Sequence, residues 1–233
     1  MEETPVALIT GSRTGIGRYL AEQLVAAGYS VVGCSREPAD WSLPGYHHFC
    51  VDVSEEPQVK TLLSQVRKRF GRLDVAVNNA GVASMNHSLL TTAATLDRIM
   101  EINVRGTFLV SRESAKLMRT GGFGRIVNLS SVAVPLKLAG EAAYVASKSA
   151  VEGLTQVMSR ELMEHGITVN AIGPGPIDTA LVRSVPQAVI KALMGRLTIK
   201  RMGQPSDVFH VLQFLIDRRS DYITGQVIYL GGV

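Results

Sequence analysis

The sequence is poor in cysteine and shows no cluster of metal-ligating residues. Its 233 residues include two cysteines, Cys34 and Cys50, both in apolar segments and without metal-like spacing. His47 and His48 are adjacent, but neighbouring side chains of an extended segment point to opposite sides, and no carboxylate or thiolate cluster accompanies them. We therefore expect reduced thiols, histidines at the surface or at a strand entry, and no bound metal.

Long hydrophobic runs and runs of a single charge are also missing. The apolar stretch from Val6 to Ile9 is far too short for the core of a signal peptide or for a membrane span. The formal net charge of +4 is spread along the chain, which argues against a nucleic-acid-binding face and suits an anionic small ligand. These features predict a cytoplasmic protein that binds a small molecule, and neither nucleic acid nor a membrane.

No repeat, low-complexity segment or Ser/Pro-rich linker divides the chain, so residues 1–233 are predicted to form one domain. Short β-branched runs alternate with longer stretches of helical periodicity. The predicted strands are Val6–Thr10, Ser30–Ser35, His48–Val51, Leu73–Asn78, Arg125–Ser130, Thr168–Ile172 and Val227–Tyr229. Helices are predicted from about Ile16 to Ala27 and at Glu56–Phe70, Thr95–Met118 and Ala143–Glu164.

This alternation is typical of βαβ units and therefore of a mostly parallel sheet. In the first helix, apolar residues at Ile16, Leu20, Leu24 and Ala27 form one stripe that can pack on a sheet face, and Gly28 ends the helix. The sequence thus predicts an α/β fold, a Rossmann-type doubly wound parallel sheet of about seven strands with helices on both faces.

The segment from Pro174 to Gly203 interrupts the pattern with three prolines and one short helical stretch near Gln187–Met194. An ordinary surface loop is one interpretation. Because the segment is long and directly follows a predicted strand, we favour a lid over the active site at about residues 180–200.

Glycines cluster directly after the first predicted strand, in the run Thr10-Gly11-Ser12-Arg13-Thr14-Gly15-Ile16-Gly17. At a strand-to-helix turn, glycine allows a tight turn, lets a pyrophosphate approach the backbone, and permits close helix packing, while the helix N-terminus stabilises the phosphate charge. An ordinary glycine turn is the alternative, but the position inside a βαβ unit favours a dinucleotide site.

The spacing Gly-x3-Gly-x-Gly resembles that of the short-chain dehydrogenase/reductase family. Four further motifs, with Asn103 in the helix between two of them, resemble that family's in the same order: Asn78-Asn79-Ala80-Gly81, Asn128-Leu-Ser-Ser131, Tyr144-x3-Lys148 and Pro174-Gly-Pro-Ile177-Asp-Thr179. The resemblance covers essentially the whole chain and is greatest to 3-oxoacyl-carrier-protein reductases. It implies hydride transfer between a nicotinamide dinucleotide and a carbonyl or secondary alcohol.

The end of the second strand predicts the choice of cofactor. An acidic residue there would bind the ribose 2′-hydroxyl of NAD and repel a 2′-phosphate. Ser35 occupies that place and Arg36 follows it, while Arg13 in the glycine turn offers a second cation. NADP(H) is therefore favoured over NAD(H), although Arg36 as an ordinary solvated residue remains the alternative.

The resemblance implies a larger set of cofactor contacts. Asp52 is expected at the adenine amino group, Asn79, Ala80 and Gly81 at the adenine ribose, and Ile177 and Thr179 at the carboxamide. The cofactor-binding residues expected overall are Gly11, Arg13, Thr14, Gly15, Ile16, Gly17, Ser35, Arg36, Asp52, Val53, Asn79, Ala80, Gly81, Tyr144, Lys148, Pro174, Gly175, Ile177 and Thr179.

Tyr144 and Lys148 are four positions apart on a predicted helix, so both project from one face. A tyrosine is a poor acid–base group at neutral pH, and a nearby ammonium, assisted by the oxidised nicotinamide, lowers its pKa toward the useful range. We expect Tyr144 to exchange the proton of the reacting oxygen. The resemblance adds that Lys148 bonds the nicotinamide ribose.

Ser131 is expected to stabilise charge on the reacting oxygen. Its neighbour Ser130 is the nearest rival, but the family's spacing selects Ser131, and strand alternation points Ser130 the other way. Asn103 is implied to support a water that relays protons to the lysine, with a plain helix-surface asparagine as the alternative. His87 is a weaker candidate for touching the substrate.

A 3-oxoacyl thioester is the leading substrate expectation, with another small ketone, a steroid-like alcohol or a keto-sugar as alternatives. The positions where the carrier-protein reductases bear docking arginines are Gly122 and His165 here, and Arg119 and Arg125 lie nearby in the sequence. The resemblance also implies a homotetramer. A non-catalytic dinucleotide sensor is a distant alternative, because it would not need the Tyr144, Lys148 and Ser131 set.

Overall fold

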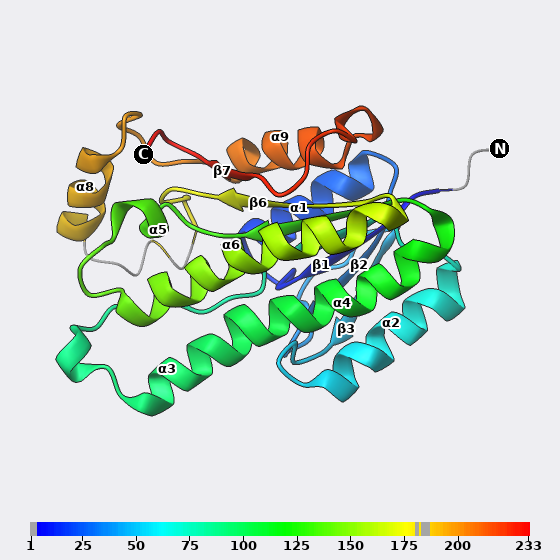
Figure 1. Cartoon of the computed structure of the whole chain (residues 1–233), viewed down its shortest axis with the longest axis horizontal. Helices are drawn as coiled ribbons and strands as arrows, with labels where there is room; N and C mark the ends of the chain where they lie inside the picture. Colours follow the sequence, from blue (N-terminus) through cyan, green and yellow to red (C-terminus); the bar gives the residue numbers. More distant parts are fainter. Residues whose placement is uncertain (1–3, 180–181, 183–186) are drawn as a thin grey trace.

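The computed structural model describes residues 4–179, 182 and 187–233. Within these residues one parallel sheet runs in the order β3-β2-β1-β4-β5-β6-β7, which confirms the predicted fold class (Figure 1). The seven strands are β1 (Val6–Thr10), β2 (Ser30–Ser35), β3 (Tyr46–Cys50), β4 (Val75–Asn78), β5 (Gly124–Leu129), β6 (Ile167–Gly173) and β7 (Val227–Tyr229).

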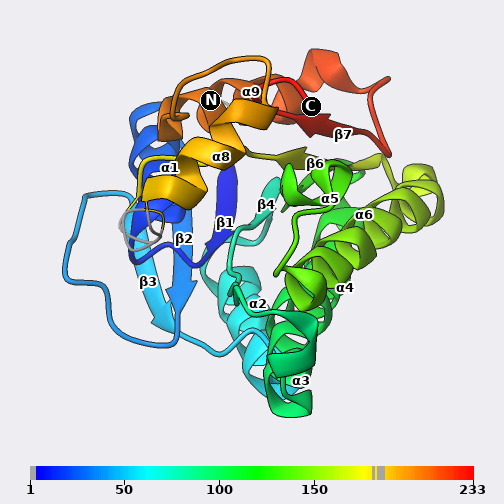
Figure 2. The same cartoon turned by 90° about the vertical axis from the view of Figure 1, so that its left-hand side faces the viewer.

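Helices cover both faces of the sheet, as Figures 1 and 2 show. On β1, Val6 and Leu8 belong to the core on one face, while Ala7 and Ile9 belong to the core on the other. The first core includes buried side chains of α2 (Glu56–Phe70), α4 (Thr107–Met118) and α6 (Ala142–Leu162), and the second those of α1 (Gly15–Ala26) and α9 (Pro205–Ile216).

The strand order reverses direction at β1, whose two neighbours are β2 on one side and β4 on the other. The chain connections therefore leave β1 and β4 toward opposite sides, which opens a crevice at the carboxyl ends of these strands. Ligands of doubly wound sheets bind at this point, and the glycine run lies directly on it.

One predicted helix is interrupted. The sequence predicted a continuous helix over Thr95–Met118, but the structure has α3 (Ala93–Met100), a π-helical segment (Glu101–Gly106) and then α4. A π turn inserts one extra residue into the helix. The hydrophobic pattern of the sequence does not reveal it, because the helices on both sides still have regular apolar faces. The wider turn contains Asn103, which is fully buried.

Residues 180–181 and 183–186, which include part of the predicted lid, lie outside the described residues. The described part of that segment contains α8 (Gln187–Arg196), which Figure 1 shows beyond the carboxyl end of β6. The Arg196 guanidinium donates a hydrogen bond to the Leu136 carbonyl at 2.5 Å, at the end of α5 (Ala133–Leu136). Leu197 is buried directly after α8.

Short 3₁₀ turns occupy Ser88–Leu90, Arg119–Gly121, Met163–His165 and Arg218–Ser220. Among the residues described, no helix combines the length and apolar character needed to cross a membrane. The same residues contain no group of three or more His, Cys, Asp or Glu side chains placed to hold a metal ion. Cys34 is buried and Cys50 exposed, and both are free thiols.

Candidate active site

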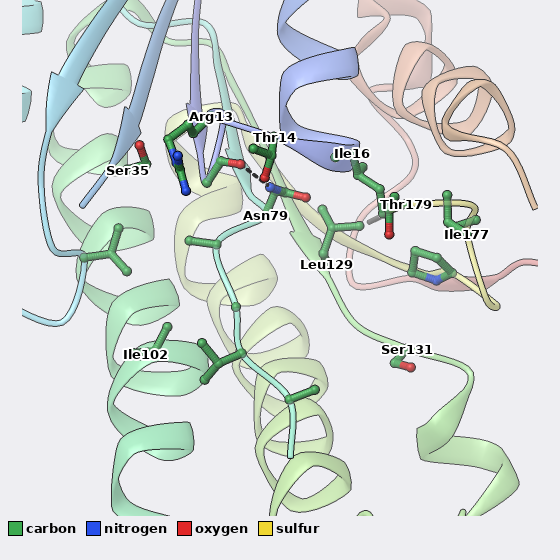
Figure 3. Close-up of a pocket in the computed structure, with 18 of the residues that line it drawn as sticks. Arg13, Thr14, Ile16, Ser35, Asn79, Ile102, Leu129, Ser131, Ile177 and Thr179 are labelled. Atoms are coloured by element: carbon green, nitrogen blue, oxygen red, sulfur yellow. Dashed lines mark hydrogen bonds between the residues drawn. The ribbon is translucent and has the colours of Figure 1, made fainter. Parts of the chain in front are cut away.

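A cavity of about 450 Å³ opens at the carboxyl ends of the central strands. Its lining includes every predicted cofactor contact except Gly17, together with Ser131, Tyr144 and Lys148. Figure 3 shows Arg13 and Ser35 at one end of the site and Ser131 at the other, with Asn79 and Leu129 between them. The two sets of residues expected to recognise a dinucleotide and to perform chemistry therefore share one elongated cavity.

The glycine turn is built around backbone conformations that favour glycine. Gly11 and Gly15 have φ angles of +68° and +59°, in the left-handed region that other residues rarely adopt. A Cβ on Gly17 would collide with the Gly11 carbonyl oxygen and the Asn79 side-chain amide. Gly17 thus lies beneath the turn and holds it close to α1, while the N-terminus of α1 faces the cavity where an anion would be stabilised.

Hydrogen bonds fasten the glycine turn to the strands beside it. The Gly11 amide donates to the Cys34 carbonyl at 2.8 Å, at the end of β2. On the other side, the Asn79 side chain donates to the Thr10 carbonyl at 2.9 Å, and the Thr10 hydroxyl accepts from the Asn79 and Ala80 amides at 3.0 Å each. The phosphate-binding turn is therefore pre-formed on a rigid scaffold.

The end of β2 carries charged groups of both signs. Arg13 and Arg36 line the cavity there with Ser35, as predicted, but so does Glu37. The Glu37 carboxylate pairs with the Arg13 guanidinium at 3.0 Å, and the Ser35 hydroxyl donates to the Glu37 carbonyl at 2.6 Å. The sequence reasoning missed Glu37, although an acidic residue about 20 positions beyond the last glycine is a known signal for ribose contact.

Asp52 and its neighbours Val51 and Val53 form a wall of the cavity just after β3. One Asp52 carboxylate oxygen accepts hydrogen bonds from the Ser54 amide at 2.9 Å and from the Ser54 hydroxyl at 2.6 Å. These bonds fix the orientation of the carboxylate, while the buried side chains of Val51 and Val53 give the wall an apolar surface. A flat aromatic base fits such a combination of apolar wall and fixed acceptor.

At the far end of the cavity, α6 presents Tyr144 toward the loop after β5. Burial raises the pKa of Tyr144 to about 12, and a hydrogen bond with the Ser131 side chain opposes part of this rise. The Ser131 hydroxyl also accepts from the Ala133 amide at 3.1 Å, which orients it at the start of α5. In the protein alone, Tyr144 is therefore a protonated phenol paired with a fixed hydroxyl.

Lys148 lies one turn further along α6, and the residue is buried, with 5% of its surface exposed. Burial lowers the pKa of its ammonium group to about 8. Its Nζ donates to the Leu129 carbonyl at 2.7 Å and lies 5.8 Å from the centre of the Tyr144 ring. A cation close to a phenol favours its phenolate form. In the protein alone, however, burial outweighs this effect and the pKa of Tyr144 lies above its ordinary value, which differs from the lowering expected from the sequence.

Asn103 lies behind the lysine. Its side chain accepts from the Val82 amide at 2.8 Å and donates to the Val82 carbonyl at 2.9 Å and to the Ser147 hydroxyl at 3.0 Å. A Cβ on Gly81 would lie 3.2 Å from the Asn103 side-chain oxygen and 3.5 Å from Lys148 Nζ. Asn103 does not line the cavity, but it adjoins the lysine through this glycine.

The neighbouring serine is engaged elsewhere. The Ser130 hydroxyl donates to the Glu152 carboxylate at 2.5 Å, and the same carboxylate oxygen accepts from the Tyr229 hydroxyl at 2.8 Å. The Ser130 hydroxyl is therefore bound to Glu152 of α6, whose carboxylate also binds Tyr229 of β7. Ser131 remains as the serine beside Tyr144.

Two histidine expectations need correction. His87 is exposed and does not line the cavity; its ring instead accepts from the Leu89 amide at 3.3 Å and caps a 3₁₀ turn. His47 and His48 lie inside β3, not at its entry. The His47 ring contacts Phe70, with centroids 5.6 Å apart, whereas His48 forms hydrogen bonds with polar groups beside the cavity. The two rings contact different groups, as alternation along a strand predicts, but which groups they meet depends on neighbours distant in sequence.

The residues present fit a dinucleotide. Glycines at positive φ next to a helix N-terminus leave room for a pyrophosphate, an apolar wall with a fixed carboxylate suits a base, and a buried phenol and ammonium lie at the other end. A cavity of this design at the switch point of a doubly wound sheet defines a dinucleotide-dependent oxidoreductase.

The family model described as enoyl-(acyl carrier protein) reductase matches residues 11–232. The chain belongs to this family of short-chain dehydrogenases/reductases, which confirms the resemblance drawn from its motifs.

Similar proteins extend over the whole chain. A 3-oxoacyl-[acyl-carrier-protein] reductase FabG from Staphylococcus aureus is 34% identical over 242 aligned residues, covering 100% of this chain and 98% of its own. A (3R)-3-hydroxyacyl-CoA dehydrogenase from Rattus norvegicus is 36% identical over 245 residues, covering 97% and 95% of the two chains. Both names describe enzymes that interconvert keto and hydroxyl groups of acyl compounds.

Solved structures show the same fold. ElxO with NADP bound superposes with a TM-score of 0.89 at 28% identity, covering 97% of each chain. A variant of ElxO with NADPH bound gives a TM-score of 0.90, also at 28% identity, over 97% of this chain and 96% of the other.

Proposed function

We propose that this protein is an NADP(H)-dependent reductase of 3-oxoacyl thioesters, which converts the 3-keto group to a secondary alcohol. The observation that carries this proposal is the single cavity that has arginines at one end and the Tyr144, Lys148 and Ser131 group at the other. The named relatives support the substrate class, and the nucleotides in the ElxO structures support the cofactor.

The charge at the end of β2 supports NADP(H). Arg36 lines the cavity next to Ser35, and Arg13 reaches the same region from the glycine turn. Two guanidinium groups can form paired hydrogen bonds with a 2′-phosphate. Glu37 opposes this preference because it neutralises Arg13 in the protein alone, so Arg36 is the main source of selectivity.

The site residues divide the chemistry among them. When bound, the cofactor supplies the hydride for reduction. Tyr144 holds a proton on its phenol and donates it to the substrate carbonyl oxygen, while the Ser131 hydroxyl stabilises the charge developing on that oxygen. Lys148 stabilises the tyrosinate that remains, because its hydrogen bond to Leu129 fixes the ammonium beside Tyr144. The same ammonium is expected to bind the cofactor ribose.

Asn103 is assigned to the proton supply. Its contacts hold Val82 and Ser147 together immediately behind Lys148. An amide in this position can orient a water molecule that returns protons to the lysine after each turnover. The π turn supports this role because it buries a polar side chain inside an otherwise regular helix.

The walls near Tyr144 favour a partly apolar substrate. Val82, Leu129 and Val182 are among the apolar side chains that line the cavity. The carrier-protein docking positions are Gly122 and His165, and Arg125 cannot replace them because its residue is only 2% exposed, with its guanidinium stacked on Phe123. Arg119 is exposed and remains as a cation near these positions. Because both docking positions themselves lack a fixed positive charge and Arg125 is buried, we favour a coenzyme A thioester or another small thioester over an acyl carrier protein.

We also propose a lid at about residues 180–200, a homotetramer and a cytoplasmic location. Val182 lines the cavity and Arg196 anchors the far end of α8 on Leu136, which supports closure over the substrate. Exposed apolar side chains on α4 and α6, Phe108 at 38% and Val157 at 55%, support burial between subunits. The free thiols of Cys34 and Cys50 suit a reducing compartment.

The direct test is the loss of NADPH or NADH absorbance with a panel of 3-oxoacyl-CoA thioesters, simple ketones, quinones and keto-sugars. We expect the highest kcat/KM with NADPH and a 3-oxoacyl-CoA. Faster turnover of a simple ketone or keto-sugar would contradict the substrate assignment, and equal use of NADH would contradict the cofactor assignment.

A further inference from the structure

A chain of hydrogen bonds runs beneath the cavity from the glycine turn to the end of β2. The Ser12 and Tyr46 hydroxyls are 2.8 Å apart, and the Tyr46 hydroxyl lies 2.7 Å from His48 Nδ1. The other ring nitrogen of His48, Nε2, lies 3.0 Å from the Ser35 hydroxyl and 3.1 Å from the Glu37 carbonyl oxygen. Side chains of the glycine turn, β2 and β3 are thus joined next to the cavity.

The direction of each bond follows from the donors available. The Ser35 hydroxyl donates its proton to the Glu37 carbonyl oxygen, so neither this hydroxyl nor this carbonyl can donate to His48 Nε2. Nε2 must therefore carry the proton, and Nδ1 of the neutral ring accepts from the Tyr46 hydroxyl. Burial raises the pKa of Tyr46 to about 12, which keeps its hydroxyl protonated as the donor. Ser12 then donates to Tyr46.

The surroundings hold this chain in place. A side chain at Gly33 would collide with the Tyr46 and Ser12 hydroxyls, so glycine is required for the two to meet across β2. The Trp41 ring stacks on Tyr46 with centroids 4.1 Å apart, and its indole nitrogen donates to the Arg13 carbonyl at 3.0 Å. These contacts connect the loop after β2 to both the glycine turn and β3.

Arg36 lies between the two residues that His48 contacts. The Ser35 hydroxyl and the Glu37 carbonyl are both bonded to Nε2, so the backbone on each side of Arg36 is fixed. The Glu37 carboxylate in turn reaches Arg13 at 3.0 Å. One ring nitrogen thereby orders the short segment that carries Arg36 and holds Glu37 beside Arg13.

We propose that His48 is a positioning residue for recognition of the cofactor 2′-phosphate. Its hydrogen bonds reach the cavity lining at Ser35 and Glu37, and it acts by holding the Ser35–Glu37 segment so that Arg36 faces the 2′ position. This inference rests on the proposed NADP(H) function. It adds a residue on an edge strand to the determinants of cofactor selectivity.

Two amide substitutions separate the roles of the ring nitrogens. In His48→Gln the side-chain amide nitrogen takes the place of Nε2, so it can still donate to Glu37 and Ser35. In His48→Asn the shorter amide replaces Nδ1 alone, so the contact with Tyr46 is kept and the contact with the segment is lost. The two variants are matched in polarity, and a general effect on folding should appear in both.

The experiment measures binding of 2′,5′-ADP and 5′-AMP by titration calorimetry, and KM and kcat for NADPH and NADH, with circular dichroism as the folding control. We expect His48→Asn to weaken 2′,5′-ADP binding roughly tenfold, consistent with the loss of one or two hydrogen bonds, with 5′-AMP binding nearly unchanged. KM for NADPH should rise in parallel while kcat stays the same. His48→Gln should remain within about twofold of the wild type on each measure.

If the wild type prefers 2′,5′-ADP and His48→Asn keeps that preference, the positioning role is wrong. Equal weakening of both nucleotides, or equal losses in His48→Gln and His48→Asn, would also overturn it, because either result indicates a general structural effect. If the wild type binds 2′,5′-ADP and 5′-AMP equally, the proposed NADP(H) selectivity is wrong, and the positioning role falls with it.

Discussion

The ammonium nitrogen of Lys148 lies 2.7 Å from the carbonyl oxygen of Leu129, the last residue of β5. This bond joins α6 to the strand end that leads directly into Ser131. Since Tyr144 lies one turn before Lys148 on the same helix, the bond also sets how Tyr144 meets Ser131. The same ammonium is buried, so the protein keeps a charge where an apolar residue would be more stable.

Replacement of this lysine should therefore separate stability from activity. We expect Lys148→Met to lose at least about 100-fold in kcat and to gain about 1–3 kcal/mol in free energy of unfolding at pH 7, because a buried charge is removed. Burial lowers the pKa of Lys148 from its ordinary value of 10.5 to about 8, so between these values the folded wild type binds fewer protons than the unfolded chain. The free energy of unfolding of the wild type therefore increases as the pH rises from about 8 to about 10.5.

The stability advantage of Lys148→Met should accordingly be full below pH 8 and fade by about pH 10.5. Urea unfolding at several pH values measures it, with Lys116→Met as a control, since Lys116 is an exposed lysine paired with Glu113. An advantage that does not change with pH would show that the folded and unfolded states share the same lysine pKa.

Arg36 should control the choice between the two nicotinamide cofactors. We expect Arg36→Ala to raise KM for NADPH by roughly 10- to 100-fold and to leave KM for NADH within about twofold, because a charge-assisted contact to the 2′-phosphate is lost. Steady-state kinetics with both cofactors measures the difference. Equal changes for both would show that Ser35 and Arg36 are not the selector.

Gly17 should be essential for the stability of the glycine turn. A methyl group at Gly17 would collide with the Gly11 carbonyl and the Asn79 amide, so Gly17→Ala should lower stability by about 2–4 kcal/mol and abolish cofactor binding. Gly195 is the matched control, because it lies in α8 with nothing within 4 Å of an added Cβ. Gly195→Ala should be neutral or stabilising by up to about 1 kcal/mol. Thermal unfolding and NADPH fluorescence compare the two variants.

Asn103 should affect turnover more than binding. Asn103→Ala removes the acceptor of the Val82 amide and the donor to Ser147, so we expect kcat to fall by roughly 10- to 100-fold with less than a threefold change in KM for NADPH. The loss should be greatest where proton supply limits the rate, and a solvent isotope effect measured in both proteins reports this. An unchanged isotope effect together with an unchanged kcat would remove Asn103 from the proton pathway.

Much of the fold and most of the cavity lining could be predicted from the sequence. The strands were visible because parallel strands buried on both faces read as apolar β-branched runs, as in Val6–Thr10. The glycine turn, Tyr144 and Lys148 were visible because their chemistry constrains residue type and local spacing. Local spacing determines these features, so a single sequence contains the signal.

What could not be predicted depends on contacts between distant segments. His48 was interpreted as a surface or strand-entry residue, and its role depends on the register that sets β3 beside β2, with His48 opposite Gly33. The π turn around Asn103 left no trace in the hydrophobic pattern. Glu37 was overlooked because its carboxylate matters through its pairing with Arg13, which is distant in sequence.

The central claim is that Tyr144 supplies the proton from within this cavity. Its most direct test is a comparison of Tyr144→Phe with the wild type, in NADPH-dependent reduction of a 3-oxoacyl-CoA and in NADPH binding followed by fluorescence. We predict that kcat falls by about 100- to 10,000-fold while the Kd for NADPH changes by less than about threefold, since the phenol proton is lost and the dinucleotide contacts remain. Turnover by Tyr144→Phe at the wild-type rate would contradict the account.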